Sequence, residues 1–357
     1  MKVGIFANTP AQVHFYSNII KKLQEKGHEA FLLARDYGET LTLLQENSIP
    51  YYLFSKSPVS KCGKMCKFPL DILKAFTYLR KLDVDIVTGF GAYNVYTSAL
   101  LRVPSIMFTD SEFTVNKKSY TIQYKLSEPF IDVVITPEAF KQDLGPKQIR
   151  VKSYKELAYL HPKYYDPNNS IHELLDISEG EGYAVLRFNA FDAVHDLGIN
   201  GFDNNAKVQL VNALKEYVHV FISAEGAVPS ELKPYMLKVP KRRIHDVLYY
   251  AKLLVTDTQT MATEAALLGT PTVRCNKFVG SNDMSNFTEL EQKYHLIYNF
   301  SNATESIQKA VELIQLSDLK DDWRVKQETL LAEKVDITEY MVSFFEKYQS
   351  EVDIWKS

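Results

Sequence analysis

Short apolar runs alternate with amphipathic stretches along most of this 357-residue chain. In the N-terminal half we predict strands at 2–7, 29–34, 50–54, 84–88, 104–109 and 131–136. We predict helices at 13–26, 38–47, 69–82, 93–102, 118–127 and 137–143. Strands that alternate with helices form parallel sheets covered by helices on both faces. The sequence therefore predicts an α/β fold.

The same alternation returns in the C-terminal half. We predict strands at 183–189, 218–223, 252–257, 271–275 and 296–299. We predict helices at 204–216, 244–251, 259–268, 288–294 and 303–315, and a helical tail from 318. Residues 151–182 break the pattern with Tyr, Pro, Asn and Gly, so we interpret them as the linker and domain boundary. Ligands of such sheets bind at the carboxyl ends of the strands.

Composition narrows the class of protein. No apolar run approaches the ~20 residues of a membrane span. We expect the first residues to form a strand rather than a signal peptide. The odd number of cysteines, three, argues against a disulfide framework. These features favour a cytoplasmic protein. The net charge of −3 argues against nucleic-acid binding. Residues 1–150 carry a net +5 and the remainder −8.

One segment of the N-terminal half is strongly basic. No acidic residue occurs from 47 to 70, and four lysines surround Cys62 and Cys66. We interpret this segment as a basic loop that guides an anionic acceptor or rests on a membrane surface. A zinc site normally needs four ligands, and the sequence offers no further Cys or His nearby.

The stretch 253–271 is the most informative about function. It predicts a buried strand, a polar turn and a helix that stops at Gly269. The first amides of the helix lack partners within it, and together with the helix dipole they suit a phosphate. The candidate phosphate-binding residues are Thr258, Gln259, Thr260 and Met261, and Glu264 lies within reach of an attached sugar. A strand, turn and helix that bind no phosphate look much the same.

Other candidate residues follow predicted strands. Arg187 and His195 follow the first strand of the second half and could hold phosphate and transfer a proton. We interpret Ser223, Glu225 and Gly226 as a wall of the nucleotide pocket.

The first half offers candidates for a general base. His14 follows the first predicted strand, 2–7. Asp110 and Glu112 follow the predicted strand 104–109. Loop capping explains the two carboxylates about as well. The pair Asp83 and Asp85 precedes its strand, so it lies at the wrong end of the sheet for a metal site, and we predict no metal.

Several of these segments together resemble a known group of enzymes. They are 13–16, 155–162, 187–190, 222–226, 256–271 and 274–276. On them the chain resembles GT-B enzymes, specifically non-hydrolysing UDP-N-acetylglucosamine 2-epimerases and MurG-type glycosyltransferases. More closely, it resembles an archaeal and bacterial domain-of-unknown-function family on that fold.

The resemblance implies two Rossmann-like, doubly wound domains that face each other across a cleft. It implies an acceptor-side domain at 1–160, a nucleotide-sugar domain at 161–335, and a helix at 336–357 that packs back on the first domain. The turn 258–261 would bind the diphosphate, Glu264 the ribose hydroxyls, and His245 would lie beside the base. Arg187 or Arg274 would stabilise the departing diphosphate charge, and His14, Asp110 or Glu112 would deprotonate the acceptor.

Two departures count against epimerase chemistry, while residues 7–12 lack the glycine-rich first loop of MurG-type enzymes. Epimerases carry an acidic residue in a first-domain turn, where this chain has Gly89-Phe90-Gly91-Ala92, and their His-Arg-x-Glu-Asn stretch is absent. We therefore predict a metal-independent glycosyltransferase of polysaccharide or surface-glycan biosynthesis. It would take a nucleotide-sugar donor, preferably a UDP-sugar, and a glycan or lipid-linked acceptor, without a cofactor. The alternatives are a UDP-sugar 2-epimerase and a non-catalytic nucleotide-sugar-binding protein.

Overall fold

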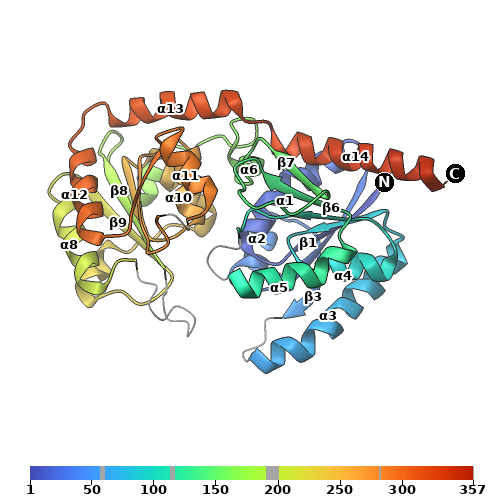
Figure 1. Cartoon of the computed structure of the whole chain (residues 1–357). Coiled ribbons are helices and arrows are strands. Elements are labelled where there is room, and N and C mark those ends of the chain that lie inside the picture. The colour runs from blue at the N-terminus through green and yellow to red at the C-terminus, as the bar shows by residue number, and fades with distance from the viewer. Residues whose placement is uncertain (57–60, 113–116, 190–200, 281–282, 357) are drawn as a thin grey trace. The chain divides into compact units, whose positions relative to one another are not determined.

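The chain forms two compact α/β units. The computed structural model describes residues 1–56, 61–112, 117–189, 201–280 and 283–356. Unit 1 comprises Met1–Tyr164 and Lys334–Ser357, and unit 2 comprises Tyr165–Glu333. Each unit has its own parallel sheet with helices on both faces (Figure 1). Among the helices described, none combines the length and the apolar character that crossing a membrane would require.

The sheet of unit 1 has seven strands in the order β3-β2-β1-β4-β5-β6-β7, and all neighbouring strands are parallel. Their bounds are β1 Lys2–Ala7, β2 Glu29–Asp36, β3 Tyr51–Lys56, β4 Ile86–Gly89, β5 Ser105–Phe108, β6 Val133–Pro137 and β7 Gln148–Val151. The six predicted strands are present, but β7 was not predicted. The helix expected at 137–143 is wrong, because β6 runs to Pro137 and turns follow it.

Helices cover both faces of this sheet. One layer contains α3 Lys61–Leu82, α4 Ala92–Leu101 and α5 Lys117–Ser127, followed by the short helix η1 Glu128–Phe130. The opposite layer contains α1 Pro10–Glu25, α2 Thr40–Glu46, α6 Leu157–Leu160 and α14 Ile337–Lys356 (Figure 1). The prediction of a basic loop around Cys62 and Cys66 is wrong in its structure, because α3 begins at Lys61.

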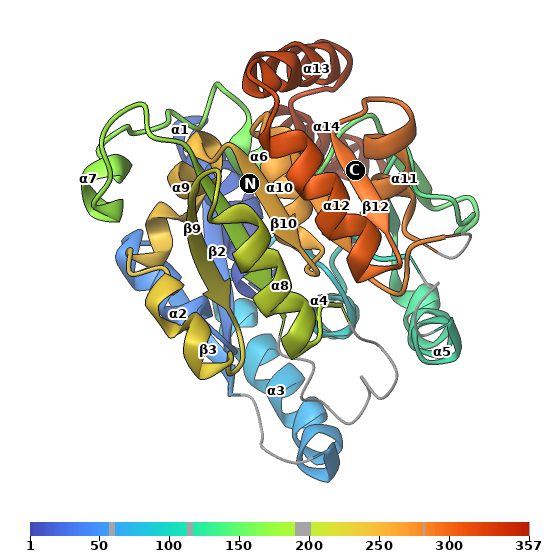
Figure 2. The same cartoon turned by 90° about the vertical axis from the view of Figure 1, so that its left-hand side faces the viewer.

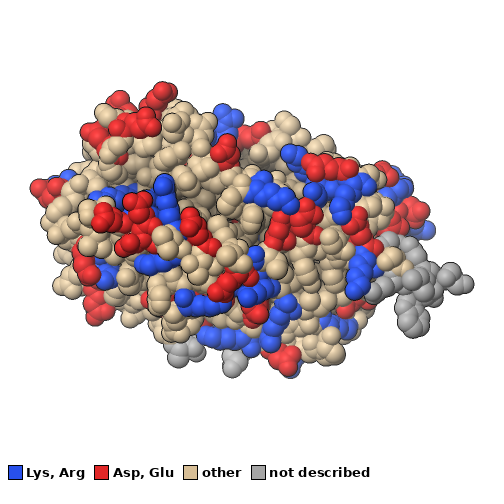
Figure 3. Space-filling view, turned by 90° about the horizontal axis from the view of Figure 1, so that it is seen from above, with Lys and Arg blue, Asp and Glu red and all other residues tan. Residues whose placement is uncertain are grey.

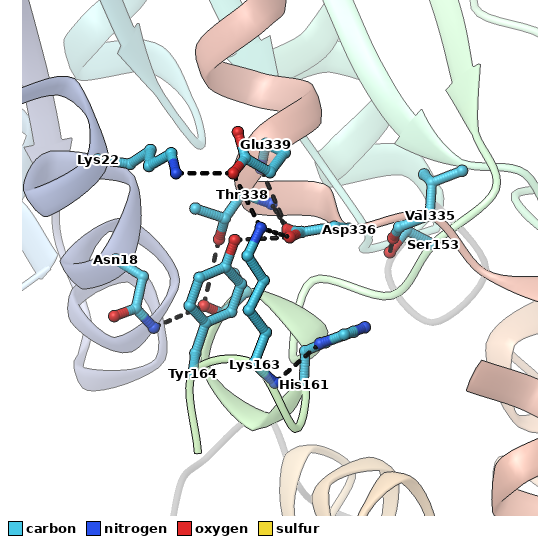
Figure 4. A network of polar contacts seen from close by, with 11 residues as sticks. Asn18, Lys22, Ser153, His161, Lys163, Tyr164, Val335, Asp336, Thr338 and Glu339 are labelled. Carbon is cyan, nitrogen blue, oxygen red and sulfur yellow. Dashed lines mark hydrogen bonds and ion pairs between the residues drawn. The ribbon is translucent and has the colours of Figure 1, made fainter. Parts of the chain in front are cut away.

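A polar network holds the C-terminal helix α14 on unit 1 (Figure 4). Glu339 accepts contacts from Lys22 of α1 and from Lys163, each at 2.8 Å. Asp336 accepts a hydrogen bond from the Tyr164 hydroxyl at 2.6 Å, and it also caps the first amides of α14. The last helix therefore packs on the first unit, as the resemblance implies.

The sheet of unit 2 has five parallel strands in the order β12-β11-β10-β8-β9. Their bounds are β8 Tyr183–Phe188, β9 His219–Ala224, β10 Leu253–Thr256, β11 Thr272–Cys275 and β12 Ile297–Phe300. The helices are α7 Ile171–Leu175, α8 Asn204–Leu214, η2 Ser230–Tyr235, η3 Lys241–Arg243, α9 Ile244–Tyr250, α10 Thr260–Leu267, α11 Ser285–Gln292, α12 Ala303–Ile314 and α13 Leu319–Glu333. Figure 2 shows α8 and α12 in front of this sheet.

Strand order locates the expected ligand positions. In doubly wound sheets, ligands bind beyond the carboxyl ends of the strands where the strand order reverses. That point lies between β1 and β4 in unit 1, and between β8 and β10 in unit 2. The doubly wound architecture was predicted correctly, and it directs attention to the loops after these four strands.

Candidate functional site

The turn between β10 and α10 has an uncapped helix start. The Thr258 N–H donates to Oγ1 of Thr256 at 2.9 Å, and this bond shapes the turn. Thr258, Gln259 and Thr260 are half-buried, whereas Met261 and the rest of α10 are buried. The side chain of Gln259, which holds the N-cap position, makes no capping hydrogen bond. The dipole of α10 therefore ends without a side-chain acceptor, a property that suits an anion.

Glu264 and His245 lie together one turn into this helix. Nε2 of His245, on α9, is 3.2 Å from Oε1 of Glu264, and both residues are buried. Carboxylates and imidazoles can be buried when hydrogen bonds within the protein replace those they lose to water. The structure thus brings together the two residues that the resemblance placed at the ribose and the base.

Arg187 lies at the carboxyl ends of β8 and β9. Its Nη1 donates to Oγ of Ser223 at 2.9 Å, and its Nη2 forms an ion pair with Glu225. Gly226 follows in the same loop. The Glu225 side chain is half exposed, so an incoming phosphate could replace this weakly held partner. His195, the other predicted residue of this region, lies outside the described residues.

Arg274 occupies a different environment from the one predicted. Its side chain is fully buried in β11, with Nη1 and Nη2 each 2.8 Å from a carboxylate oxygen of Asp283. Nη1 also donates to Asn299, and the guanidinium lies 3.7 Å from the ring centre of Phe287. Its charge is thus already neutralised in the core, and phosphate binding by Arg274 stays a prediction.

Asp257 was not predicted as a site residue. It is the first residue after β10, it is buried, and its carboxylate accepts the N–H groups of Asn189 and Phe202 at 2.7 and 3.4 Å. Burial raises the pKa of Asp257 to about 6, although these backbone hydrogen bonds lower it. A carboxylate directly after an otherwise apolar strand was the signal in the sequence.

In unit 1, His14 stacks on an aromatic ring. Its imidazole lies 5.0 Å from the ring of Tyr159, with an angle of 28° between the ring planes. His14 is half-buried near the start of α1, while Tyr159 is buried in α6. The stacking links two of the segments that carry the family resemblance.

Asp110 is held by a lysine that the sequence analysis missed. Lys155 forms an ion pair with Asp110 and lies 3.5 Å from Oε1 of Glu156. Burial lowers the pKa of Lys155, but the two carboxylates outweigh burial and hold it above its usual range. The Asp110 carboxylate is therefore held by the ammonium group of Lys155, and its role as a general base stays a prediction.

Glu112 has a structural position. Its side chain is buried, and Oε1 accepts the backbone N–H of Lys141 at 2.6 Å. This contact holds the turn that follows β6. This contact is what the alternative of loop capping expects, and a role of Glu112 as a base stays a prediction. No cluster of three or more His, Cys, Asp and Glu side chains able to bind a metal occurs among the residues described.

Residues 1–315 match the protein family described as Protein of unknown function (DUF354). The chain belongs to the DUF354 family. A protein of Methanocaldococcus jannaschii is 23% identical to this DUF354 chain over 292 residues, covering 77% of the chain and 82% of the relative. An N-acetylglucosamine transferase of Acinetobacter baumannii, which uses UDP-N-acetylglucosamine by its name, is 36% identical over 81 residues. That match covers 21% of the chain and 22% of the transferase.

Solved structures share the fold over nearly the whole chain. The UDP-GlcNAc 2-epimerase of Neisseria meningitidis, bound to UDP-GlcNAc, has a TM-score of 0.63 and 11% identity, and the match covers 93% of the DUF354 chain and 100% of the epimerase. MurG of Acinetobacter baumannii has a TM-score of 0.57 and 16% identity, covering 97% and 99%. The DUF354 chain therefore has a GT-B-like fold, and the resemblance seen in the sequence is confirmed.

Proposed function

We propose that this DUF354 protein is a nucleotide-sugar-dependent glycosyltransferase of surface-glycan or polysaccharide biosynthesis. The observation that carries the proposal is the buried Glu264–His245 pair beside the uncapped start of α10. These features lie where the strand order of unit 2 reverses, the usual ligand position in this architecture. UDP-sugars are the favoured donors, because fold relatives are named for UDP-N-acetylglucosamine.

Each group has a proposed chemical role. The amides at 258–261 bind the diphosphate, and Glu264 accepts hydrogen bonds from the ribose hydroxyls. Arg187 exchanges its ion pair with Glu225 for the charge that develops on the leaving diphosphate. His14, which stacks on Tyr159, takes the proton from the acceptor hydroxyl.

An epimerase is the second candidate. The fold match to an epimerase has a TM-score of 0.63 against 0.57 for MurG, a difference that favours this alternative. The turn 89–92 still offers no carboxylate for proton removal from the sugar, and for that reason we favour transfer. A non-catalytic nucleotide-sugar-binding protein would keep the unit 2 site and lack turnover.

A surface of unit 1 supports a lipid-linked acceptor. Helices α3, α4, α5 and η1 carry nine Lys or Arg and two acidic residues. One of the two, Asp71, is buried and bonded to Ser55, and the other is Glu128 of η1. Exposed apolar side chains occur on the same helices and on η1: Leu70, Leu73, Leu100, Ile122, Leu126 and Phe130. By contrast, basic and acidic side chains are mixed on the side of unit 1 that carries α14 (Figure 3).

We call helices α3–α5 with η1 the basic apolar face. Exposed apolar side chains on helices rich in lysine favour the surface of an anionic membrane, because the lysines are attracted to the lipid charge while the apolar groups enter the interface. A lipid-linked acceptor would be met at such a surface. The proposal is peripheral association of the basic apolar face with membranes.

Binding and turnover separate the candidates. Calorimetry with UDP-, GDP-, CMP- and dTDP-sugars should identify a preferred donor, and the absence of binding to all four would refute the proposal. The preferred donor is then incubated with a membrane extract as the acceptor source. Release of the nucleoside diphosphate that requires the extract indicates transfer, whereas an epimerised donor formed without extract indicates epimerisation. Binding without either product indicates a non-catalytic protein.

A further inference from the structure

Asp257 joins three loops at the carboxyl edge of the unit 2 sheet. Its carboxylate accepts the N–H of Asn189, directly after β8, and the N–H of Phe202, just before α8. Its own carbonyl oxygen accepts Nδ2 of Asn276, directly after β11, at 3.0 Å. The loops after β8, β10 and β11 are therefore tied to one residue at the start of the phosphate-binding turn.

The surroundings of Asp257 leave little freedom for this residue. A Cβ atom added to Gly201 would lie 2.2 Å from Cβ of Asp257, so this close approach requires glycine. A carboxylate offers an acceptor oxygen to each of the two backbone donors, whereas an amide side chain offers only one. The close approach of Gly201 and the two backbone donors therefore fit a carboxylate at position 257.

The ionised carboxylate is costly at this position. Burial is the largest influence on the pKa of Asp257, which is raised to about 6. Among the residues that the structure describes, the charged and titratable neighbours are Lys207 of α8, which attracts the carboxylate, and Cys275 of β11. The ammonium group of Lys207 lies over the ring of Phe188, 5.3 Å from its centre. Burial therefore opposes ionisation of Asp257, while the two backbone N–H donors and Lys207 favour it.

We propose that Asp257 is a positioning residue for the nucleotide-sugar. In its ionised form it holds both ends of the loop after β8 against the turn 258–260, so that Arg187 and the α10 amides meet the diphosphate in a fixed arrangement. The inference rests on the proposed function, because it assigns the diphosphate to this turn.

The test compares the parent with Asp257→Asn, using UDP-GlcNAc as the probe. The diphosphate of this probe is esterified at both ends, so the ligand itself does not titrate near pH 6. The parent should lose affinity as the pH falls from 7.5 to 5.5. Asp257→Asn should bind about tenfold or more weakly at pH 7.5, the scale of one hydrogen bond to a charged group, and its affinity should not change with pH.

Stability gives a readout that separates positioning from a structural role. Because the pKa of Asp257 lies above its ordinary 3.8 in the folded protein, folding takes up a proton between about pH 4 and 6. The ionised form therefore reduces the stability of the fold above about pH 6. Relative to Asp257→Asn, the parent should lose thermal stability but gain affinity for UDP-GlcNAc as the pH rises from 5.5 to 7.5. A parent whose thermal stability and affinity change in the same direction over this range, relative to the variant, would overturn the inference.

Two controls make the outcome specific. Asp203→Asn changes a nearby carboxylate that caps α8, a role that asparagine also fills, so it should leave affinity and its pH profile unchanged. Histidines commonly titrate in this range, so the profile is repeated in His245→Gln, where the bend near pH 6 should persist. This second profile also tests the inference if Asp257→Asn does not fold.

Failure of this inference can be distinguished from failure of the proposed function. If the parent binds UDP-GlcNAc and Asp257→Asn binds it equally with the same pH profile, the inference is wrong and the proposed function stands. If the parent binds UDP-GlcNAc with a profile that is flat between pH 7.5 and 5.5, the inference is also wrong. If the parent binds no nucleotide-sugar, the proposed function and the inference fail together.

Discussion

Substitution of Asp283 tests whether Arg274 belongs to the core or to the site. Arg274 is fully buried and makes two 2.8 Å contacts with the Asp283 carboxylate. Asp283→Asn keeps the shape of this side chain but leaves the buried guanidinium without a counter-charge. Removing one partner of a buried ion pair typically costs about 3–5 kcal/mol. In a domain the size of unit 2, that loss lowers the melting temperature by roughly 6–20 °C.

The matched control is an exposed ion pair of the same unit. Glu225 pairs with Arg187, and its side chain is 49% exposed. Glu225→Gln should change the free energy of unfolding by about 0–1 kcal/mol, since water screens exposed pairs. Calorimetric unfolding of both variants, read on the transition of unit 2, measures the difference. Arg274→Met combined with Asp283→Asn should recover much of the loss, because the uncompensated charge is removed.

The refuting result is clear. If Asp283→Asn unfolds within 1 kcal/mol of the parent, the buried pair does not carry the energy assigned to it here. The double variant should also bind the preferred nucleotide-sugar like the parent, since Arg274 is not expected to contact phosphate. A tenfold loss of affinity in a folded double variant would return Arg274 to the binding site.

Three further predictions concern the proposed site and surface. Glu264→Gln should weaken UDP-GlcNAc binding, measured by calorimetry, by roughly 10–150-fold. The control Glu328→Gln changes an exposed side chain and should bind like the parent. Equal affinities of Glu264→Gln and the parent would remove Glu264 from the site. Leu126→Glu should reduce co-sedimentation with anionic vesicles, whereas the control Val325→Glu on unit 2 should not. A parent protein that does not co-sediment with the vesicles would refute the membrane proposal. Turnover should persist in EDTA, and recovery of a lost activity by Mg²⁺ or Mn²⁺ would contradict metal-independent transfer.

Local sequence patterns were sufficient to predict most of the architecture. Alternation of apolar runs and amphipathic stretches predicts parallel sheets, because buried strands and covering helices need those two periodicities. All eleven predicted strands lie within two residues of the observed ones at each end. The strand β7 escaped prediction because it is a short edge strand whose residues are mostly polar or partly exposed.

The sequence by itself also determined where to look for the site, because residues after parallel strands gather at one edge of the sheet. Only the tertiary structure decided what each side chain does there. In the folded protein, Glu264 contacts His245, and Arg274 contacts Asp283 in the core. The Glu112 carboxylate accepts a backbone N–H. The reason is physical: the energy of a charged side chain depends on its burial and its partners, and these come from segments far away along the chain.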